Sequence, residues 1–312
     1  MPEHTLIEQF SAERAALAAA LIPRAVVIAA RRRRTVSAIR WRGPYLISAA
    51  EALAGVEQVS FRAAPGADTP DARAQRGEIV ALDLTTDVAV IRTDADPAVH
   101  PADAPTVRDA LTLGETVAIV GCDGHGALLR WGTVCLAGSA WRSRRGGEIA
   151  QRLEFDAALD TRFDGALVAD ASGRVAAMQV AGPFGRALGI PAATIERVLG
   201  AVERHGYVPR PYLGLRLHTL WLDPPTVARL GRRSAHVAVV AGVDAGSPAA
   251  RAGLEVGDLI ETLDAEEVGG VDAVARILTG KAPGSALALG LRRGGALDTR
   301  TLTVAERPRA AG

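Results

Sequence analysis

The feature that most constrains this chain is a succession of short β-rich segments, each bounded by turn residues, from about residue 25 to residue 181. The 33 glycines and 17 prolines among 312 residues favour many turns and short strands over a few long helices. Several short strands at regular spacing predict a closed or sandwiched antiparallel fold. The segments are residues 25–29, 36–41, 78–82, 88–91, 117–120, 133–136 and 175–180.

One amphipathic helix follows this β-rich region. Thr194 is a candidate N-cap, apolar residues recur at helical spacing as far as Val202, and Gly206 is a typical C-terminal stop. Two prolines within residues 207–211 indicate a linker. Beyond it we expect strands at 237–241, 257–263 and 286–291, a short helix capped by Ser247, and a helix over 271–278.

Composition and charge exclude several classes of function. The net charge of +1 gives no general attraction to nucleic acid or to acidic lipid. The four arginines at 31–34 are a local exception, and we interpret them as a solvated hairpin tip rather than as phosphate contacts. Cys122 and Cys135 are too few for a disulfide framework, and we expect both to be buried, reduced thiols. Two cysteines are too few for a zinc site unless His125 joins them, and we do not expect that arrangement. We therefore predict no metal and no cofactor.

The N-terminal region does not resemble a secretory signal. Glu3, Glu8 and Glu13 occupy the part that should be basic, and the apolar run at 15–23 is short. No segment reaches the roughly 18 uninterrupted apolar residues of a membrane span. The sequence therefore predicts a cytoplasmic protein, although an alternative start or a processed precursor would overturn that prediction.

Several motifs, in order, resemble the HtrA/Deg family of serine proteases. Residues 246–260 resemble the bacterial PDZ signature, and residues 77–91 resemble the segment that carries the family's catalytic aspartate. Further matches lie at 113–121, 132–138 and 190–199. The resemblance implies a mainly β protein: an N-terminal extension (1–14), a trypsin-like double β-barrel (15–206), a linker (207–211) and a PDZ domain (212–308).

The catalytic positions depart from the family pattern. The resemblance assigns the aspartate to Asp87, but places Glu51 where the family has histidine and Phe163 where it has serine. Acyl transfer needs an activated hydroxyl or thiol, a base and donors for the oxyanion. Phenylalanine offers no nucleophile, glutamate is a weak base at neutral pH, and Thr161 replaces an oxyanion glycine. The resemblance therefore implies a catalytically degenerate site.

A PDZ domain binds an extended peptide by adding it as a strand to a sheet edge. The resemblance implies a carboxylate-binding turn at Tyr212, Leu213, Gly214 and Leu215, with a helix side of the groove formed by Val271, Val274 and Leu278. Such an apolar groove predicts a preference for an apolar C-terminal residue. The alternative interpretation is that these leucines and the helix stripe belong to the core of the small domain.

These observations favour a pseudoprotease that binds protein C-termini or extended peptides as a scaffold or regulatory subunit. One alternative is an active serine-type endopeptidase with an atypical site, using Thr161. Another is a structural subunit of a larger enzyme complex. HtrA proteins commonly form trimers through an aromatic-rich N-terminal segment. Residues 1–22 contain one aromatic side chain, Phe10, so trimerisation is not expected.

Overall fold

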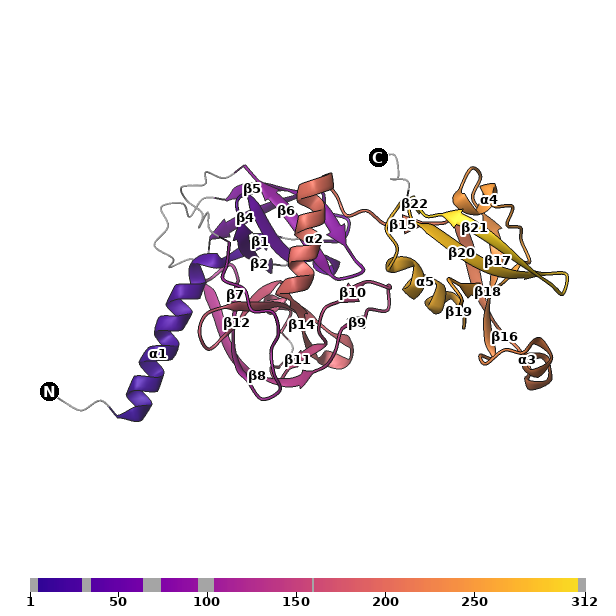
Figure 1. Ribbon diagram of the computed structural model, residues 1–312. Helices are drawn as coiled ribbons and strands as arrows, with labels where there is room; N and C mark the ends of the chain where they lie inside the picture. The colour runs from indigo at the N-terminus through magenta and orange to yellow at the C-terminus, as the bar shows by residue number, and fades with distance from the viewer. Residues whose placement is uncertain (1–4, 30–34, 64–73, 95–103, 159, 308–312) are drawn as a thin grey trace. The chain divides into compact units, whose positions relative to one another are not determined.

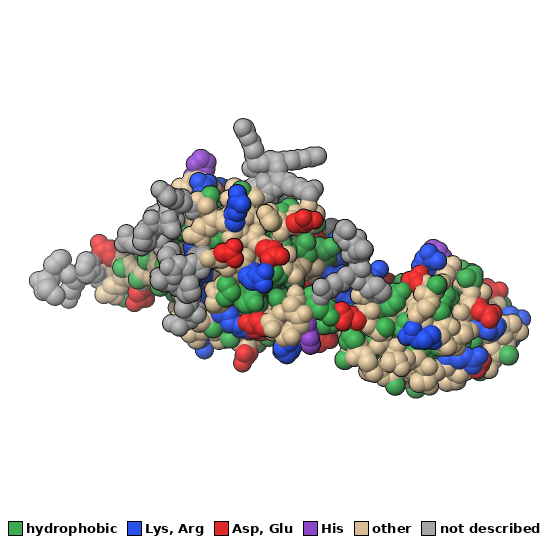
Figure 2. All heavy atoms as spheres, turned by 90° about the horizontal axis from the view of Figure 1, so that it is seen from above, with side chains coloured by type: hydrophobic (Ala, Val, Ile, Leu, Met, Phe, Trp, Pro, Cys, Tyr) green, Lys and Arg blue, Asp and Glu red, His purple; other side chains and the backbone are tan. Residues whose placement is uncertain are grey.

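The structure is a computed structural model that describes residues 5–29, 35–63, 74–94, 104–158 and 160–307. The run of four arginines therefore lies outside the described residues. The chain divides into two compact units, with the principal boundary between Val208 and Pro209 (Figure 1). On the face seen in Figure 2, acidic and basic side chains are interspersed over both units rather than gathered by sign.

The first half of the first unit is a closed antiparallel barrel of six strands in the order β1-β2-β3-β6-β5-β4. Pairing of Ala29 with Ser60 and of Val26 with Ala63 joins the first strand to the last and closes the barrel. Its strands are β1 (Ala25–Ala29), β2 (Thr35–Arg42), β3 (Tyr45–Ala49), β4 (Gln58–Ala63), β5 (Gln75–Asp83) and β6 (Val88–Thr93).

A second closed barrel of six strands follows, in the order β11-β14-β13-β12-β7-β8. Together the two barrels confirm the predicted closed antiparallel architecture. The strands of the second barrel are β7 (Thr116–Cys122), β8 (Ala127–Ala137), β11 (Leu153–Phe155), β12 (Ala166–Asp170), β13 (Val175–Ala181) and β14 (Ala187–Pro191). A separate small hairpin consists of β9 (Trp141–Arg142) and β10 (Glu148–Ile149).

The cysteines differ in exposure. Cys122 is fully buried, as predicted, but Cys135 is exposed, so the prediction of two buried thiols is wrong for Cys135. The reason is the alternation of β8, where Val134 faces the barrel core and its neighbour Cys135 faces the opposite side. Among the described residues, no three His, Cys, Asp or Glu side chains gather closely enough to hold a metal ion.

Two helices accompany the barrels. Helix α1 (Leu6–Leu21) begins with a capping box between Thr5 and Glu8 and crosses the expected boundary at residue 14. Its first turns expose Leu6, Ile7 and Phe10, whereas Leu21 is buried in the core.

Helix α2 (Ala192–His205) begins two residues before the expected cap, because Pro191 occupies the N-cap position. The Thr194 hydroxyl instead accepts a hydrogen bond from the Ala150 amide at 2.9 Å. Gly206 ends the helix in the left-handed conformation, as predicted. Trp41 Nε1 donates to Glu196 at 2.6 Å, which anchors the helix to the first barrel.

The second unit is built around an antiparallel sheet in the order β16-β17-β18-β20-β21, with helix α5 (Val271–Thr279). Ser247 caps the short helix α4 (Pro248–Arg251), as predicted, because its Oγ accepts from the Ala250 amide at 3.1 Å. The other elements are β15 (Pro211–Tyr212), β16 (Leu215–Trp221), α3 (Pro224–Leu230), β17 (His236–Val243), β18 (Leu259–Leu263), β19 (Glu266–Glu267), β20 (Ala286–Arg293), β21 (Ala296–Thr303) and β22 (Ala305–Glu306).

A buried ionic cluster joins the loop after α3 to strands β18 and β20 of the second unit, and local sequence patterns did not predict it. The guanidinium of Arg232, 3% exposed, pairs with Glu261 and donates to the Val268 carbonyl at 2.7 Å. Arg292 Nε reaches the other oxygen of Glu261 at 2.7 Å. The loop after α3 is therefore attached to the sheet by charge-assisted hydrogen bonds.

Candidate functional sites

The structure brings Glu51 and Asp87 together. Glu51 begins the 3₁₀ helix η3 (Glu51–Leu53), and Asp87 lies in the turn between β5 and β6 with a left-handed backbone, φ +59°. Asp87 Oδ1 accepts a hydrogen bond from the Glu51 amide at 2.7 Å, and its carbonyl accepts from the Ala50 amide at 3.3 Å. The aspartate therefore holds the chain at the expected histidine position through the backbone of Glu51.

Phe163 is placed differently. It ends the 3₁₀ helix η5 (Thr161–Phe163), and its ring packs in the core of the second barrel, only 4% exposed. The guanidinium of Arg130 lies over the ring, 4.4 Å from its centroid. The next residue, Asp164, is the member of this loop whose charge acts on Asp87. The structure therefore joins Glu51 and Asp87 by a hydrogen bond, whereas the Phe163 ring packs in the core of the second barrel.

The pKa of Asp87 is raised to about 7. Burial is the largest cause, because it disfavours the charged carboxylate, and the charges of Glu51 and Asp164 add to it. Hydrogen bonds from the amides of Glu51 and Ala50 act in the opposite direction. The residue that the family resemblance placed at the histidine position, Glu51, therefore contacts Asp87 through its backbone amide.

The backbone amides of the loop at residues 160–165 donate hydrogen bonds to acceptors within the same loop. Asp160 caps η5, and its Oδ1 accepts from the Arg162 amide at 3.0 Å. The Phe163 amide donates to the Asp160 carbonyl at 2.9 Å, and the Asp164 amide donates to the Thr161 carbonyl at 3.2 Å. Three consecutive N–H groups are therefore engaged inside the turn.

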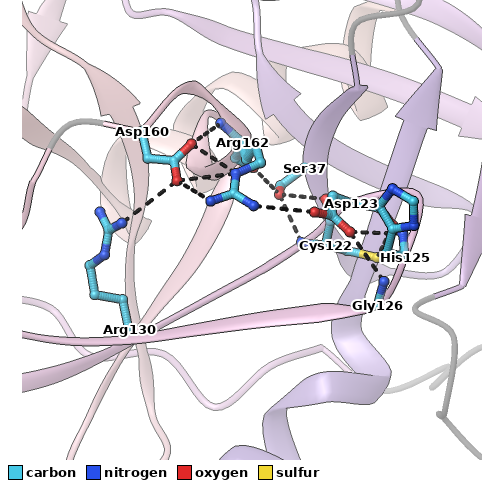
Figure 3. Close-up of polar contacts among 8 residues, drawn as sticks. All are labelled: Ser37, Cys122, Asp123, His125, Gly126, Arg130, Asp160 and Arg162. Carbon is cyan, nitrogen blue, oxygen red and sulfur yellow. Dashed lines mark hydrogen bonds and ion pairs between the residues drawn. The ribbon is translucent and has the colours of Figure 1, made fainter.

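Ser37 of β2 holds the same loop against the first barrel (Figure 3). Its amide donates to the Asp164 carbonyl at 3.0 Å, and its hydroxyl donates to the Arg162 carbonyl at 2.8 Å and accepts from the Cys122 amide at 3.0 Å. Gly165, with φ +82°, permits this approach, since a Cβ there would lie 2.0 Å from the Ser37 carbonyl oxygen.

Ion pairs complete the attachment of the loop (Figure 3). Arg162 contacts Asp160 at 2.7 Å and Asp123 at 3.5 Å, while Arg130 approaches Asp160 at 3.7 Å. Sequence reasoning missed Ser37, Asp123 and Asp160. Of these three, only Asp160 could have been predicted from the sequence, because aspartate favours the N-cap position that precedes a helical turn. The roles of Ser37 and Asp123 depend on contacts across the two barrels.

In the second unit, the segment from Tyr212 to Leu215 forms a turn fixed by hydrogen bonds. The Tyr212 hydroxyl donates to Asp244 at 2.7 Å, and this hydrogen bond raises the pKa of Tyr212. The carbonyls of Leu213 and Gly214 accept from the amides of Ala249 and Asp244, both at 2.9 Å. Because C=O and the following N–H point oppositely in a trans peptide, the amides of Gly214 and Leu215 face away from those partners.

The predicted groove residues divide into two groups. Leu213 and Val274 are buried in the core of the unit, as the alternative interpretation held. Leu215, Val271 and Leu278 are half-buried, and Leu215 and Leu278 also pack against that core. Leu215 begins β16, and Val271 begins α5, where its amide bonds to Thr219 of β16. The half-buried side chains therefore lie between the strand and the helix.

Two family models match the chain. Residues 34–178 match a trypsin-like peptidase domain, and residues 239–293 match a PDZ domain. The fold and these matches define a trypsin-like peptidase domain followed by a PDZ domain.

Similar proteins carry the same architecture. A "probable periplasmic serine endoprotease DegP-like" of Rhizobium meliloti (strain 1021) is 30% identical over 241 residues, 74% of this chain and 46% of the relative. Its counterpart in Brucella suis biovar 1 is 28% identical over 238 residues, 74% of this chain and 45% of the relative. The chain thus spans less than half the length of these curated relatives.

Solved structures agree with the sequence matches. The HtrA-type protease AlgW with tripeptide is 26% identical with a TM-score of 0.67, and the alignment covers 95% of this chain and 98% of that one. The same protease with decapeptide gives a TM-score of 0.69 at 23% identity, covering 95% and 99%. The chain therefore belongs to the HtrA family.

The predicted cytoplasmic location is wrong. The curated relatives are named periplasmic endoproteases, which points to the periplasm. The prediction rested on the charges of the first residues, and that local signal is outweighed by the relationship over three quarters of the chain. Within the described residues, no helix has the length and apolar character that crossing a membrane requires.

Proposed function

We propose that this chain is a non-catalytic HtrA homologue that binds protein C-termini or extended peptides through its PDZ domain, as a scaffold or regulatory subunit. The observation that carries the proposal is Phe163, whose ring fills the barrel core at the position expected for the nucleophile. A phenyl ring offers no atom that attacks a carbonyl carbon.

The backbone of the same loop supports the proposal. An oxyanion hole needs amide donors that point at the developing negative charge. Here the amides of Arg162, Phe163 and Asp164 are bonded within η5. The carboxylate of Asp164 also follows directly, and negative charge beside the reacting oxygen opposes its development.

An active endopeptidase is the second candidate, because the curated relatives are named serine endoproteases. Thr161 supplies the hydroxyl in that case, since it is the exposed side chain that begins η5. Its neighbours in sequence, Asp160 and Arg162, are an acid and a cation rather than a histidine that could act as the base.

Casein cleavage and labelling by a fluorophosphonate probe distinguish the two candidates. We expect the wild-type chain to cleave no unfolded casein and to take up no label, with trypsin as the positive control. Thr161→Ala and Asp87→Asn should match the wild type in both assays. Cleavage or labelling that either substitution abolishes would show that the chain is an enzyme.

Peptide binding is tested separately. The turn at residues 212–215 directs the amides of Gly214 and Leu215 away from their carbonyl partners, an arrangement that suits a carboxylate. The HtrA-type protease AlgW, which shares this architecture, was solved with a tripeptide and with a decapeptide, and this supports the proposal.

The experiment is a screen of the full chain against a library of peptides with free C-termini. We expect selection of apolar C-terminal residues, loss of binding when the carboxylate is amidated, and at least tenfold weaker binding for Val271→Glu. Val256→Glu is the matched control, because Val256 is an exposed valine elsewhere in the same unit. Binding that ignores amidation, or a library that yields no apolar preference, would contradict the proposed groove.

A further inference from the structure

Strand β16 has an open edge. It ends the strand order, and among the strands of the described residues only β17 pairs with it. The Gly214 carbonyl bonds to Asp244 on the β17 side, so the backbone groups of the odd-numbered residues face the open edge. Side chains alternate along a strand, so these residues also share one face. They are Leu215, Leu217, Thr219 and Trp221.

Helix α5 covers only the first part of this face. Leu215 and Leu217 pack against the core of the unit. At Thr219, the hydroxyl accepts from the Val271 amide at 3.0 Å, and a Cβ on Gly270 would lie 2.9 Å from Thr219 Cγ2. The helix therefore begins at the level of Thr219. Figure 1 shows the outer end of the β16–β17 hairpin and α3 extending beyond α5.

Trp221 lies at this uncovered end of the strand and is 64% exposed. Its partner across the ladder is His236, which is also exposed. A large aromatic side chain on an open strand edge contributes much contact area at low entropic cost when a partner covers it. The indole thus continues the row of side chains that begins in the proposed peptide groove.

We propose that Trp221 is a second specificity site, which contacts an apolar or aromatic side chain upstream of the bound C-terminus. This inference rests on the proposed peptide-binding function. A peptide added antiparallel to β16 places its carboxylate at the 212–215 turn, beside Leu215. Its upstream residues then extend along the strand towards Trp221. Trp221 lies six residues after Leu215, so its cross-strand neighbour is about the sixth residue before the C-terminal one.

The experiment compares three probes on the full chain. The first is the tightest pentapeptide from the C-terminal library, and the second extends it by five residues with phenylalanine six positions before the C-terminus. The third places aspartate at that position. We expect the phenylalanine decapeptide to bind roughly five- to tenfold tighter than the other two.

Trp221 also supplies the readout. The chain has four tryptophans, and the other three, Trp41, Trp131 and Trp141, belong to the first unit. The phenylalanine decapeptide should protect Trp221 from iodide quenching, whereas the pentapeptide should not. Trp221→Phe removes that signal but keeps most of the affinity gain, and Trp221→Ala removes the gain. Leu297→Ala, which alters a side chain with 67% exposure, is the matched control and should leave the gain unchanged.

The outcomes separate the two proposals. Equal affinity of the pentapeptide and the phenylalanine decapeptide, or unchanged quenching of Trp221, would overturn the role of Trp221 and leave the C-terminal groove intact. A library that yields no binding peptide at all would overturn the peptide-binding function and this inference with it.

Discussion

At the scale of single residues, Asp87 shows how a buried aspartate holds a neighbouring segment of chain through hydrogen bonds to its backbone. Asp87 accepts hydrogen bonds from two consecutive amides, those of Ala50 and Glu51. Its left-handed backbone is a conformation that aspartate and asparagine adopt more readily than other residues with side chains. Both properties explain its presence without an appeal to proton transfer.

The raised pKa of Asp87 predicts a pH-dependent stability. The folded-state pKa of about 7 lies above the unfolded value of about 3.9, so the folded state holds the proton more tightly. The free energy of unfolding should therefore fall as pH rises from about 4 to about 7 and then level off. Asp87→Asn should remove this fall, because the amide keeps an acceptor oxygen and carries no charge.

Urea denaturation of wild type and Asp87→Asn at pH 5 and pH 8 measures this effect. The variant should gain stability over the wild type between pH 5 and pH 8. An identical pH dependence in the two proteins would show that Asp87 is not the titrating group.

At the scale of elements, the loop at 160–165 is the clearest case of a segment fixed by close packing between two barrels. Gly165→Ala would bring a Cβ to 2.0 Å from the Ser37 carbonyl, in addition to the strain of φ +82°. We expect a loss of about 3 kcal/mol or more in the free energy of unfolding. Gly43→Ala is the control, because Gly43 also has a positive φ but no atom lies within 4 Å of the added Cβ. That control should cost only about 1 kcal/mol, and equal losses measured by urea denaturation would contradict the account of the loop.

The turn between β12 and β13 depends on Asp170, whose side chain is 4% exposed. Burial raises the pKa of Asp170, but hydrogen bonds from Ser172, Arg108 and Arg174 outweigh it and lower the pKa to about 2. The resulting stability is complete above the unfolded pKa of about 3.9 and is lost as pH falls through about 2.

Asp170→Asn should therefore cost on the order of 1–2 kcal/mol at pH 7, with the difference from wild type shrinking towards pH 2. Thermal unfolding at pH 7, 4 and 2.5 follows this change. Glu57→Gln, at an exposed carboxylate, is the control. A difference that stays constant down to pH 2.5 would exclude the ionised form of Asp170 as its source.

The sequence predicted regular elements better than it predicted contacts between them. Short β-rich segments between turn residues predicted a closed or sandwiched antiparallel fold, and the family resemblance specified two barrels. Ser247 and Gly206 marked helix ends correctly. Thr194 was misread as a cap because its hydroxyl bonds to Ala150, 44 residues away. The ties from Ser37 to the 160–165 loop and from Arg232 to Glu261 likewise join distant segments, which local patterns do not reveal.

At the scale of the whole molecule, a trypsin-like peptidase domain precedes a PDZ domain whose strand β16 ends its sheet. The net charge is small, and on the face shown in Figure 2 the acidic and basic side chains are interspersed, so no surface of a single sign forms there.

The proposed peptide recognition therefore depends on backbone pairing and apolar side chains. We expect peptide affinity to change less than threefold between 50 and 300 mM salt. A tenfold loss in a fluorescence titration over that range would indicate charge-dominated binding instead.

The most direct test of binding without cleavage is a time course of labelled, unfolded casein with the full chain saturated by its library-selected peptide. Saturation keeps the PDZ domain occupied throughout the assay, so that binding and cleavage are measured on the same state of the chain. We predict no release of label above the buffer control over the period in which trypsin digests the substrate completely. Steady release that depends on the peptide and is lost in Thr161→Ala would contradict the central claim and identify an enzyme.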